Sequence, residues 1–283
     1  MCELLGMDCN VPTDILFSFT GLAMRGGRTA PHSDGWGLAL YEGRFARTFL
    51  EPLPACDSAL ARFLSFNPIR TLIAIAHVRR RTRGAQAIEN THPFKRVFWG
   101  RHWTFAHNGT LPAVKERRLA DFTPLGETDS EHAFCWMLGE LRAAFPDGYP
   151  EDRLPELWRT IAELTGVLGA EGSFNVLLSD GRHLFARCGT KLCHLIRSAP
   201  FGRATLRDAD VQVDFSATAG QHDRVAIVAT EPLTCDETWT PGRPGTMWVF
   251  EDGLLRTTLA SRDPSGRDEW AGPPDFPDEA IAR

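Results

Sequence analysis

Several features are scarce in this 283-residue sequence, and each scarcity excludes a class of protein. No apolar run approaches the roughly 18–20 residues that cross a bilayer, so we expect no transmembrane helix and no membrane partner. Lys and Arg total 31 against 36 Asp and Glu, a formal net charge of −5, so no basic excess favours nucleic-acid binding. No basic stretch precedes an apolar segment at the N-terminus, which predicts a cytoplasmic protein.

Cysteine is present, but its arrangement favours neither disulfides nor zinc. The seven cysteines are odd in number and scattered, at positions 2, 9, 56, 135, 188, 193 and 235, and no C-x-x-C pair occurs. Cys188 and Cys193 have no matching Cys/His pair nearby, so we expect no structural zinc site. The pattern is typical of free, mostly buried thiols in a reducing compartment.

The predicted elements run from β-rich to helical and back to β-rich, which favours a layered α+β domain of two packed sheets flanked by helices. No internal repeat and no clear linker occur, so we expect a single domain over 2–260, followed by a polar, proline-rich tail over 261–283. Strands are predicted at 2–6, 36–41, 45–50, 72–78, 94–99, 102–106, 173–179, 184–188, 192–196, 224–230 and 247–250, and helices at 15–23, 57–66, 129–144 and 154–168.

Cys2 is the most informative residue of the chain. A small second residue permits removal of the initiator methionine, which leaves a cysteine with a free α-amino group. That residue then holds a thiol of reference pKa about 8.5 and an amine of about 7.7–8.0. The amine can serve as general base for its own side chain. Taken alone, however, Cys2 is more often an ordinary cysteine.

Short polar motifs elsewhere change that balance. In chain order they are Asp34-Gly35-Trp36-Gly37, Ala76-His77-Val78-Arg79-Arg80-Arg81-Thr82, Asn90-Thr91-His92-Pro93-Phe94, Phe105-Ala106-His107-Asn108-Gly109-Thr110-Leu111, Gly126-Glu127-Thr128-Asp129-Ser130-Glu131 and Ala229-Thr230-Glu231-Pro232-Leu233. Together with Cys2, this ordered set resembles the class II glutamine amidotransferases, and within them a stand-alone bacterial subgroup. The resemblance extends along most of the chain. It implies a four-layer αββα sandwich of the N-terminal nucleophile hydrolase type.

The resemblance assigns the catalytic roles to three residues. Cys2 matches the nucleophile that attacks the side-chain amide of glutamine, forms a γ-glutamyl thioester and releases ammonia. Asn108 and Gly109 match the oxyanion-hole pair, whose side-chain NH₂ and backbone N–H stabilise the charged tetrahedral intermediate. From the residues alone, Asn-Gly is more often a hairpin turn.

The resemblance also implies three substrate contacts. Arg79 matches the arginine that binds the substrate α-carboxylate, a task suited to its planar fork, and Thr82 matches a hydroxyl contact to the same group. Asp129 matches the carboxylate that pairs with the α-ammonium. A carboxylate at a helix N-terminus is also favoured by the helix dipole, and both roles are compatible.

His77, His92 and His107 could suggest a Cys–His dyad or zinc, but in the resembled family the terminal amine is the base. We therefore expect these histidines to be structural or supporting residues, and the chemistry needs no metal or organic cofactor. The glycine-rich loop over 25–35 is a candidate lid. The resemblance leaves open whether Arg25 or Arg28 covers the pocket.

Three functions follow from these residues. The first is a glutaminase that passes ammonia to a separate acceptor protein, and the second is a stand-alone hydrolase of another γ-glutamyl compound. The third is a non-catalytic amino-acid-binding module, which has no need of an oxyanion pair. In all three the partner is a small molecule, and the sequence does not identify it further.

Overall fold

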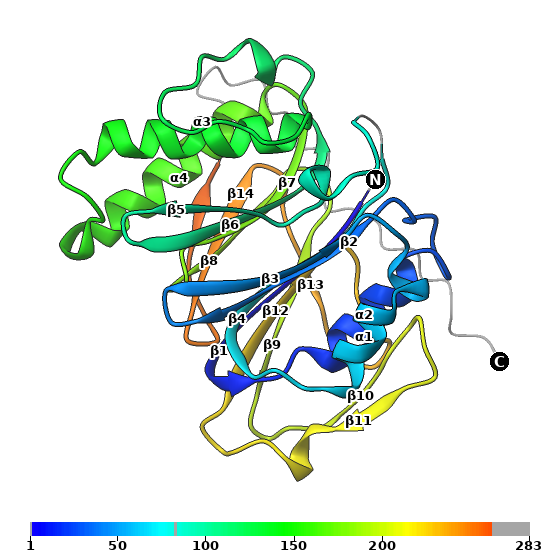
Figure 1. The fold of residues 1–283 in the computed structure, drawn as a ribbon. Coiled ribbons are helices and arrows are strands. Elements are labelled where there is room, and N and C mark those ends of the chain that lie inside the picture. Colours follow the sequence, from blue (N-terminus) through cyan, green and yellow to red (C-terminus); the bar gives the residue numbers. More distant parts are fainter. Residues whose placement is uncertain (1, 82–83, 262–283) are drawn as a thin grey trace.

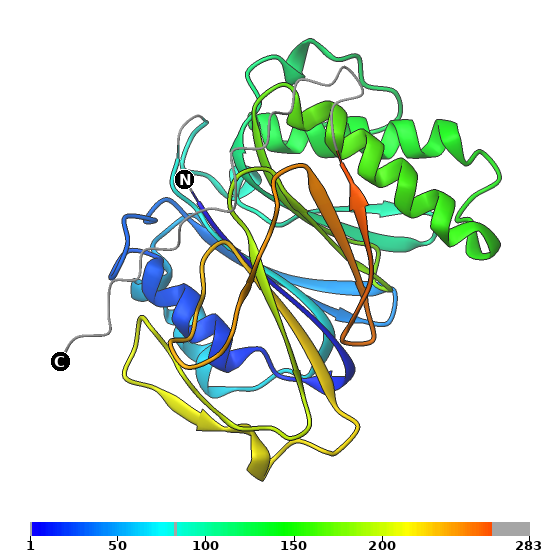
Figure 2. The ribbon, with the colours of Figure 1, turned by 180° about the vertical axis from the view of Figure 1, so that it is seen from behind.

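The computed structural model describes residues 2–81 and 84–261. Two antiparallel sheets lie face to face, with a pair of helices on the outer face of each (Figures 1 and 2). The first sheet has the order β13-β9-β12-β1-β4-β2-β3, and the second has the order β15-β14-β8-β7-β6-β5. The predicted four-layer αββα sandwich is confirmed.

The bounds of the elements show how closely the sequence pattern predicted them. The first sheet comprises β1 (Glu3–Thr13), β2 (Trp36–Glu42), β3 (Phe45–Glu51), β4 (Thr71–Val78), β9 (Cys193–Ser198), β12 (Arg224–Ala229) and β13 (Thr240–Pro241). The second comprises β5 (Phe94–Phe98), β6 (Arg101–Thr110), β7 (Ser173–Ser179), β8 (Leu184–Cys188), β14 (Thr246–Glu251) and β15 (Leu254–Ala260). The helices are α1 (Leu16–Arg25), α2 (Ala59–Phe66), α3 (Asp129–Ala144) and α4 (Leu154–Gly169).

Alternation along β1 explains how one strand serves two cores. Leu5 and Met7 pack in the core shared with α1 and α2, whereas Leu4 lies in the core between the sheets. Gly6 shares the face of Leu4, and a Cβ there would lie 3.0 Å from Leu184 of the facing sheet. Because side chains alternate along a strand, Cys2 also falls on the face between the sheets.

The helices cover the outer faces, and α3 has a well-defined start. The Thr128 side chain accepts a hydrogen bond from the Glu131 backbone N–H, as expected of a helix N-cap. Glu131 is buried, pairs with Arg96 of β5 at 2.5 Å and accepts hydrogen bonds from the backbone of Leu125 and Gly126. These contacts fix the loop that leads into α3 against the second sheet.

Several parts of the chain depart from the sequence-based expectations. β13 and β15 were not predicted as strands, and β6 extends to Thr110 rather than ending at residue 106. A short hairpin of β10 (Arg203–Thr205) and β11 (Gln212–Asp214), seen in yellow in Figure 1, had no prediction because its strands are three residues each. The first strand was expected to end at residue 6 but extends to Thr13. The predicted tail lies outside the described residues except for Ser261. No described helix is long and apolar enough to span a membrane.

Candidate active site

The proposed nucleophile and oxyanion donor lie at the same end of the sheet sandwich. In the first sheet, Glu3 of β1 pairs with Val78 of β4, so Cys2 and Arg79 follow directly at this end. In the second sheet, Asn108 lies near the end of β6, on the face that also carries Ala106 of the inter-sheet core. The Asn108 side chain donates a hydrogen bond to the Cys2 carbonyl oxygen and so bridges the two sheets.

The Cys2 thiol is half-buried and contacts only backbone among its hydrogen-bond partners in the described residues. Its Sγ accepts a hydrogen bond from the Arg80 N–H at 3.2 Å and lies 3.4 Å from the Arg80 carbonyl oxygen. Burial raises the pKa of the thiol, while the Arg80 N–H and the Arg79 cation oppose that rise. A thiol whose pKa is raised above its ordinary value is protonated at neutral pH.

Asn108 and Gly109 form part of a strand, so the hairpin-turn interpretation of this pair is wrong. Asn108 pairs with Asn175 of β7, and Gly109 pairs with Phe174. Gly109 has φ +156, and a Cβ there would lie 1.8 Å from the Ser173 carbonyl oxygen. Only glycine fits at this position. Asn108 is fully buried, and its Oδ1 has no hydrogen-bond partner in the described part of the chain.

Arg79 and Asp129 are each held in place by hydrogen bonds to the backbone. Arg79 is buried, and its Nη1 donates to the Ala85 carbonyl oxygen at 3.0 Å. Asp129 is the first residue of α3, and its Oδ2 accepts from the Leu111 N–H at 2.7 Å, two residues beyond Gly109. Its Oδ1 accepts from the Ser130 N–H, as a helix N-terminal carboxylate does. Thr82 lies outside the described residues.

The three histidines are buried around this end, and none of them hydrogen-bonds Cys2. His107 donates from Nε2 to the Ser173 carbonyl oxygen at 3.1 Å, so its Nδ1 accepts from the Ser130 hydroxyl at 2.8 Å. The ring centroids of His77 and His92 are 4.3 Å apart. Burial lowers the pKa of His77 to about 3, so it is a neutral imidazole. No potential metal cluster occurs among the described residues.

A buried ion-pair network fixes the start of β1, next to Cys2. Arg25 donates to Glu3 Oε2 at 3.2 Å, to Asp208 Oδ2 at 2.7 Å and to the carbonyl oxygens of Glu231 and Pro232 at 3.3 and 2.6 Å. Burial raises the pKa of Glu3 to about 7 although the Arg25 cation opposes it. Arg25 therefore joins the end of α1 to three other chain segments, at residues 3, 208 and 231–232. Arg28 is exposed. Which arginine covers a bound substrate stays a prediction.

Asn175 was missed by the sequence analysis. It is fully buried, and its Oδ1 accepts from the backbone N–H groups of Gly189, Thr190 and Lys191 at 2.9–3.1 Å. Its Nδ2 donates to the Asn108 carbonyl oxygen at 3.2 Å and to the Thr190 hydroxyl at 2.8 Å. Asn175 thus holds both the Asn108 backbone and the β8–β9 loop. The available signal was an asparagine within the otherwise apolar stretch of β7.

Comparison with known proteins identifies the family. A family model described as class II glutamine amidotransferases matches residues 1–272. The chain therefore belongs to the class II glutamine amidotransferases, and this membership makes it an enzyme. It is 50% identical over 250 residues to the YafJ protein of Escherichia coli (strain K12), covering 88% of this chain and 97% of that protein. It is 33% identical over 259 residues to MJ1515 of Methanocaldococcus jannaschii, covering 90% and 70%.

Solved structures agree with this assignment. A crystal structure of a predicted glutamine amidotransferase from Pseudomonas aeruginosa PA01 is 41% identical, with a TM-score of 0.70, covering 90% of this chain and 100% of that one. The glutamine phosphoribosylpyrophosphate amidotransferase of B. subtilis is 16% identical with a TM-score of 0.55, covering 92% of this chain and 49% of that one. The second likeness shows the shared fold alone.

Proposed function

We propose that this enzyme cleaves the side-chain amide of glutamine through a γ-glutamyl thioester on Cys2 and releases ammonia. The observation that carries the proposal is the hydrogen bond from the Asn108 side chain to the Cys2 carbonyl oxygen. It joins a thiol on one sheet to an amide donor on the other, beside a glycine whose neighbourhood excludes every other residue type. A nucleophile next to two oxyanion donors is the arrangement that acyl transfer requires.

Removal of Met1 makes the α-amine of Cys2 the base. The amine takes the thiol proton as Sγ attacks the amide carbon, and the carbonyl oxygen becomes an oxyanion beside Asn108 and Gly109. The tetrahedral intermediate collapses as the protonated α-amine of Cys2 returns its proton to the leaving nitrogen, which departs as ammonia. Water then attacks the thioester, giving glutamate and restoring the thiol. The unpartnered Asn108 Oδ1 supports this scheme, because it can accept a hydrogen bond from the new amine.

Arg79, Thr82 and Asp129 are the proposed contacts to the α-carboxylate and α-ammonium of the substrate. Opposite charges at these two groups select a free γ-glutamyl compound over a glutamine within a protein chain. The leaving amine and any separate protein that accepts ammonia are not defined by these residues. A cytoplasmic location also stays a prediction.

The test combines processing, labelling and turnover. Intact mass should show the loss of Met1, and a glutamine-analogue electrophile should label Cys2 rather than the exposed Cys235. Ammonia and glutamate release from glutamine and from a panel of γ-glutamyl amides should be lost in Cys2→Ala. Cys56→Ala, at another half-buried free cysteine, is the matched control and should keep its activity. If a protein that retains Met1 is active, the α-amine of Cys2 is not the base. If no member of the panel is turned over, the proposed function is wrong.

A further inference from the structure

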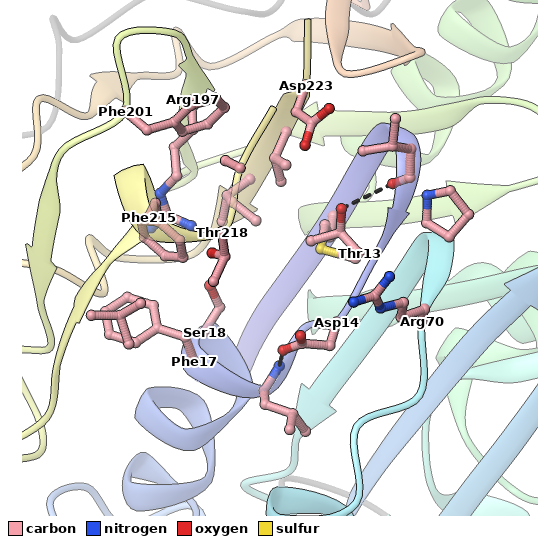
Figure 3. Close-up of a pocket in the computed structure, with 18 of the residues that line it drawn as sticks. Thr13, Asp14, Phe17, Ser18, Arg70, Arg197, Phe201, Phe215, Thr218 and Asp223 are labelled. Carbon is pink, nitrogen blue, oxygen red and sulfur yellow. Dashed lines mark hydrogen bonds between the residues drawn. The ribbon is translucent and has the colours of Figure 1, made fainter. Parts of the chain in front are cut away.

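A cavity of about 690 Å³ lies on the outer face of the first sheet, on the side away from the inter-sheet core near which Cys2 and Asn108 lie. Its floor includes Met7 of β1 and Ile227 of β12, both of which belong to the core on the helix side of the sheet. The start of α1 and the segment that follows β11 form its sides (Figure 3). Cavities of about 300–1,000 Å³ hold small-molecule ligands.

One side of the cavity is lined by aromatic rings that contact one another and an arginine. Arg197 pairs with Glu237 through two hydrogen bonds of 2.7 Å each, so its charge is already neutralised. Its guanidinium lies 4.6 Å from the centre of the Phe215 ring and 5.7 Å from that of Phe17. These two rings meet edge to face at 5.5 Å. Phe201 adds a third ring to the lining. This wall suits a flat or branched apolar group.

The other side carries charged side chains that make few hydrogen bonds or ion pairs with the described residues. Figure 3 shows Asp14 and Arg70 on this side, across the cavity from Arg197 and Phe215. Arg70 makes no hydrogen bond or ion pair with any described residue. Asp14 uses one oxygen, Oδ1, to accept from the Leu16 N–H at 3.3 Å. Asp223, also in the lining, uses Oδ2 to accept from the Gly220 N–H at 2.8 Å. A guanidinium and carboxylates are thus available around one apolar volume.

We propose that this cavity binds a free α-amino acid with an aromatic or branched apolar side chain. The side chain packs against Phe17 and Phe215, the α-carboxylate binds Arg70, and the α-ammonium binds Asp14. A zwitterionic head group is the chemistry that satisfies both charges at once, whereas an apolar ligand without charges leaves them unmatched. This site is separate from the one proposed for glutamine, and it does not depend on the proposed reaction.

Binding titrations of the full-length protein test each contact. The probes are L-phenylalanine and L-leucine, with L-phenylalaninamide, which lacks the carboxylate, and N-acetyl-L-phenylalanine, which lacks the ammonium. We expect saturable binding of the amino acids and an affinity about fivefold lower for each derivative, as befits exposed ion pairs. Arg70→Gln should abolish the discrimination against the amide alone, and Asp14→Asn should abolish the discrimination against the N-acetyl derivative alone.

A cavity-filling variant separates this site from the glutamine site, which would also recognise an α-amino acid. Thr218 is exposed and points into the cavity in Figure 3, so Thr218→Trp should fill it without disturbing the core and should remove L-phenylalanine binding. Thr238→Trp, at an exposed threonine outside the lining, is the matched control and should bind normally. Absence of saturable binding overturns the proposal. So does binding that Thr218→Trp and Arg70→Gln leave unchanged, because the ligand then lies elsewhere.

Discussion

The two ends of the sheet sandwich treat their buried polar groups differently. At the end that carries Cys2, Asn108 Oδ1 has no hydrogen-bond partner in the described residues, nor do the ring nitrogens of His77 and His92. A buried polar atom without a partner costs about 1–3 kcal/mol of stability. This end of the sandwich therefore keeps donors and acceptors that the chain alone does not satisfy.

At the opposite end, Arg101 Nε and the indole nitrogens of Trp103 and Trp158 also lack partners among the described residues, but the central carboxylate, Asp180, is satisfied at both oxygens. Asp180 is fully buried, and Oδ1 accepts from the backbone N–H groups of Arg182 and His183 at 2.9 and 2.7 Å. Its Oδ2 accepts from the Tyr149 hydroxyl at 2.5 Å and from His183 Nδ1 at 3.1 Å. His183 Nε2 lacks a hydrogen bond but lies 3.8 Å from Glu251 Oε1. This end fixes the β7–β8 turn.

The difference indicates a division of labour along the same strands. β6 and β7 contribute Asn108 and Asn175 at one end, and Thr104 and Ser179, which hydrogen-bond the buried Tyr41 hydroxyl, at the other. Side chains that bind a ligand commonly keep polar atoms that the chain itself does not satisfy, such as Asn108 Oδ1, whereas the structural carboxylate of Asp180 is satisfied within the chain. Substitutions at the Cys2 end should therefore change activity, and substitutions at the Asp180 end should change stability.

The largest expected effect is that of Asn108→Asp. The substitution keeps the side-chain shape but removes the NH₂ donor and adds negative charge beside the developing oxyanion. We expect kcat for glutamine hydrolysis to fall about 10²–10³-fold, equivalent to about 2.7–4 kcal/mol. Steady-state kinetics measure this loss, with the thermal midpoint as a check on folding. A variant with normal kcat would remove Asn108 from the oxyanion hole.

Asp180→Ala should have its effect on stability. It leaves the Tyr149 hydroxyl and two backbone N–H groups without their acceptor, so we expect a loss of about 3 kcal/mol in the free energy of unfolding. Urea denaturation measures the loss, and Asp152→Ala, at an exposed aspartate, is the control. Activity at a temperature where the variant stays folded should be normal. A folded variant with impaired kcat would break the proposed division.

The Asp180 carboxylate should also make the protein less stable at low pH. Burial alone would raise the pKa of Asp180, but hydrogen bonds from His183 and Tyr149 outweigh it and lower the pKa to about 2. The folded-state pKa lies below the unfolded value of about 3.9, so this stabilisation is present above about pH 4 and is lost as pH falls toward 2. Asp180→Ala should therefore flatten the acid side of the stability curve.

The buried carboxyl group of Asp8 should make the free energy of unfolding depend on pH in the opposite direction. It is buried in the middle of β1, where its Oδ1 accepts from the Gly253 N–H at 2.6 Å, and burial raises its pKa to about 7. The stabilisation linked to this raised pKa is present below about pH 4 and is lost as pH rises through 7. Asp8→Asn keeps the acceptor oxygen but does not titrate. We therefore expect the difference in free energy of unfolding between variant and wild type to shift in favour of the variant by on the order of 2 kcal/mol from pH 5 to pH 8. Denaturation at both pH values measures it, and equal curves would contradict it.

The smallest expected effect is that of Arg79→Lys. A lysine keeps the charge but cannot reproduce a bidentate carboxylate contact, so we expect KM for glutamine to rise about tenfold with little change in kcat. Arg81→Lys, two residues along and exposed, is the control. An unchanged KM in the Arg79 variant would exclude it from the carboxylate site.

The sequence predicted the layers well because strong local periodicity dictates them. α3 spans the predicted residues 129–144, and the hairpin of β2 and β3 differs from its prediction by one residue at the end of each strand. Cys2, Asn108 and Gly109 were selected by resemblance, because an Asn-Gly pair alone indicates a turn. Asn175 and the Arg25 network escaped prediction because their partners lie far apart in the sequence, 14 to 207 residues away.

The chain by itself determined the two-sheet architecture, since hydrophobic periodicity specifies which face of each strand and helix is buried. It also determined the chemistry available, through a cysteine at position 2 and the motifs that follow the strands. Only the tertiary structure decided that Asn108 crosses to the Cys2 backbone and that a cavity forms behind the same sheet. Such contacts depend on how two sheets stack and where loops return, and local sequence patterns do not encode those distances.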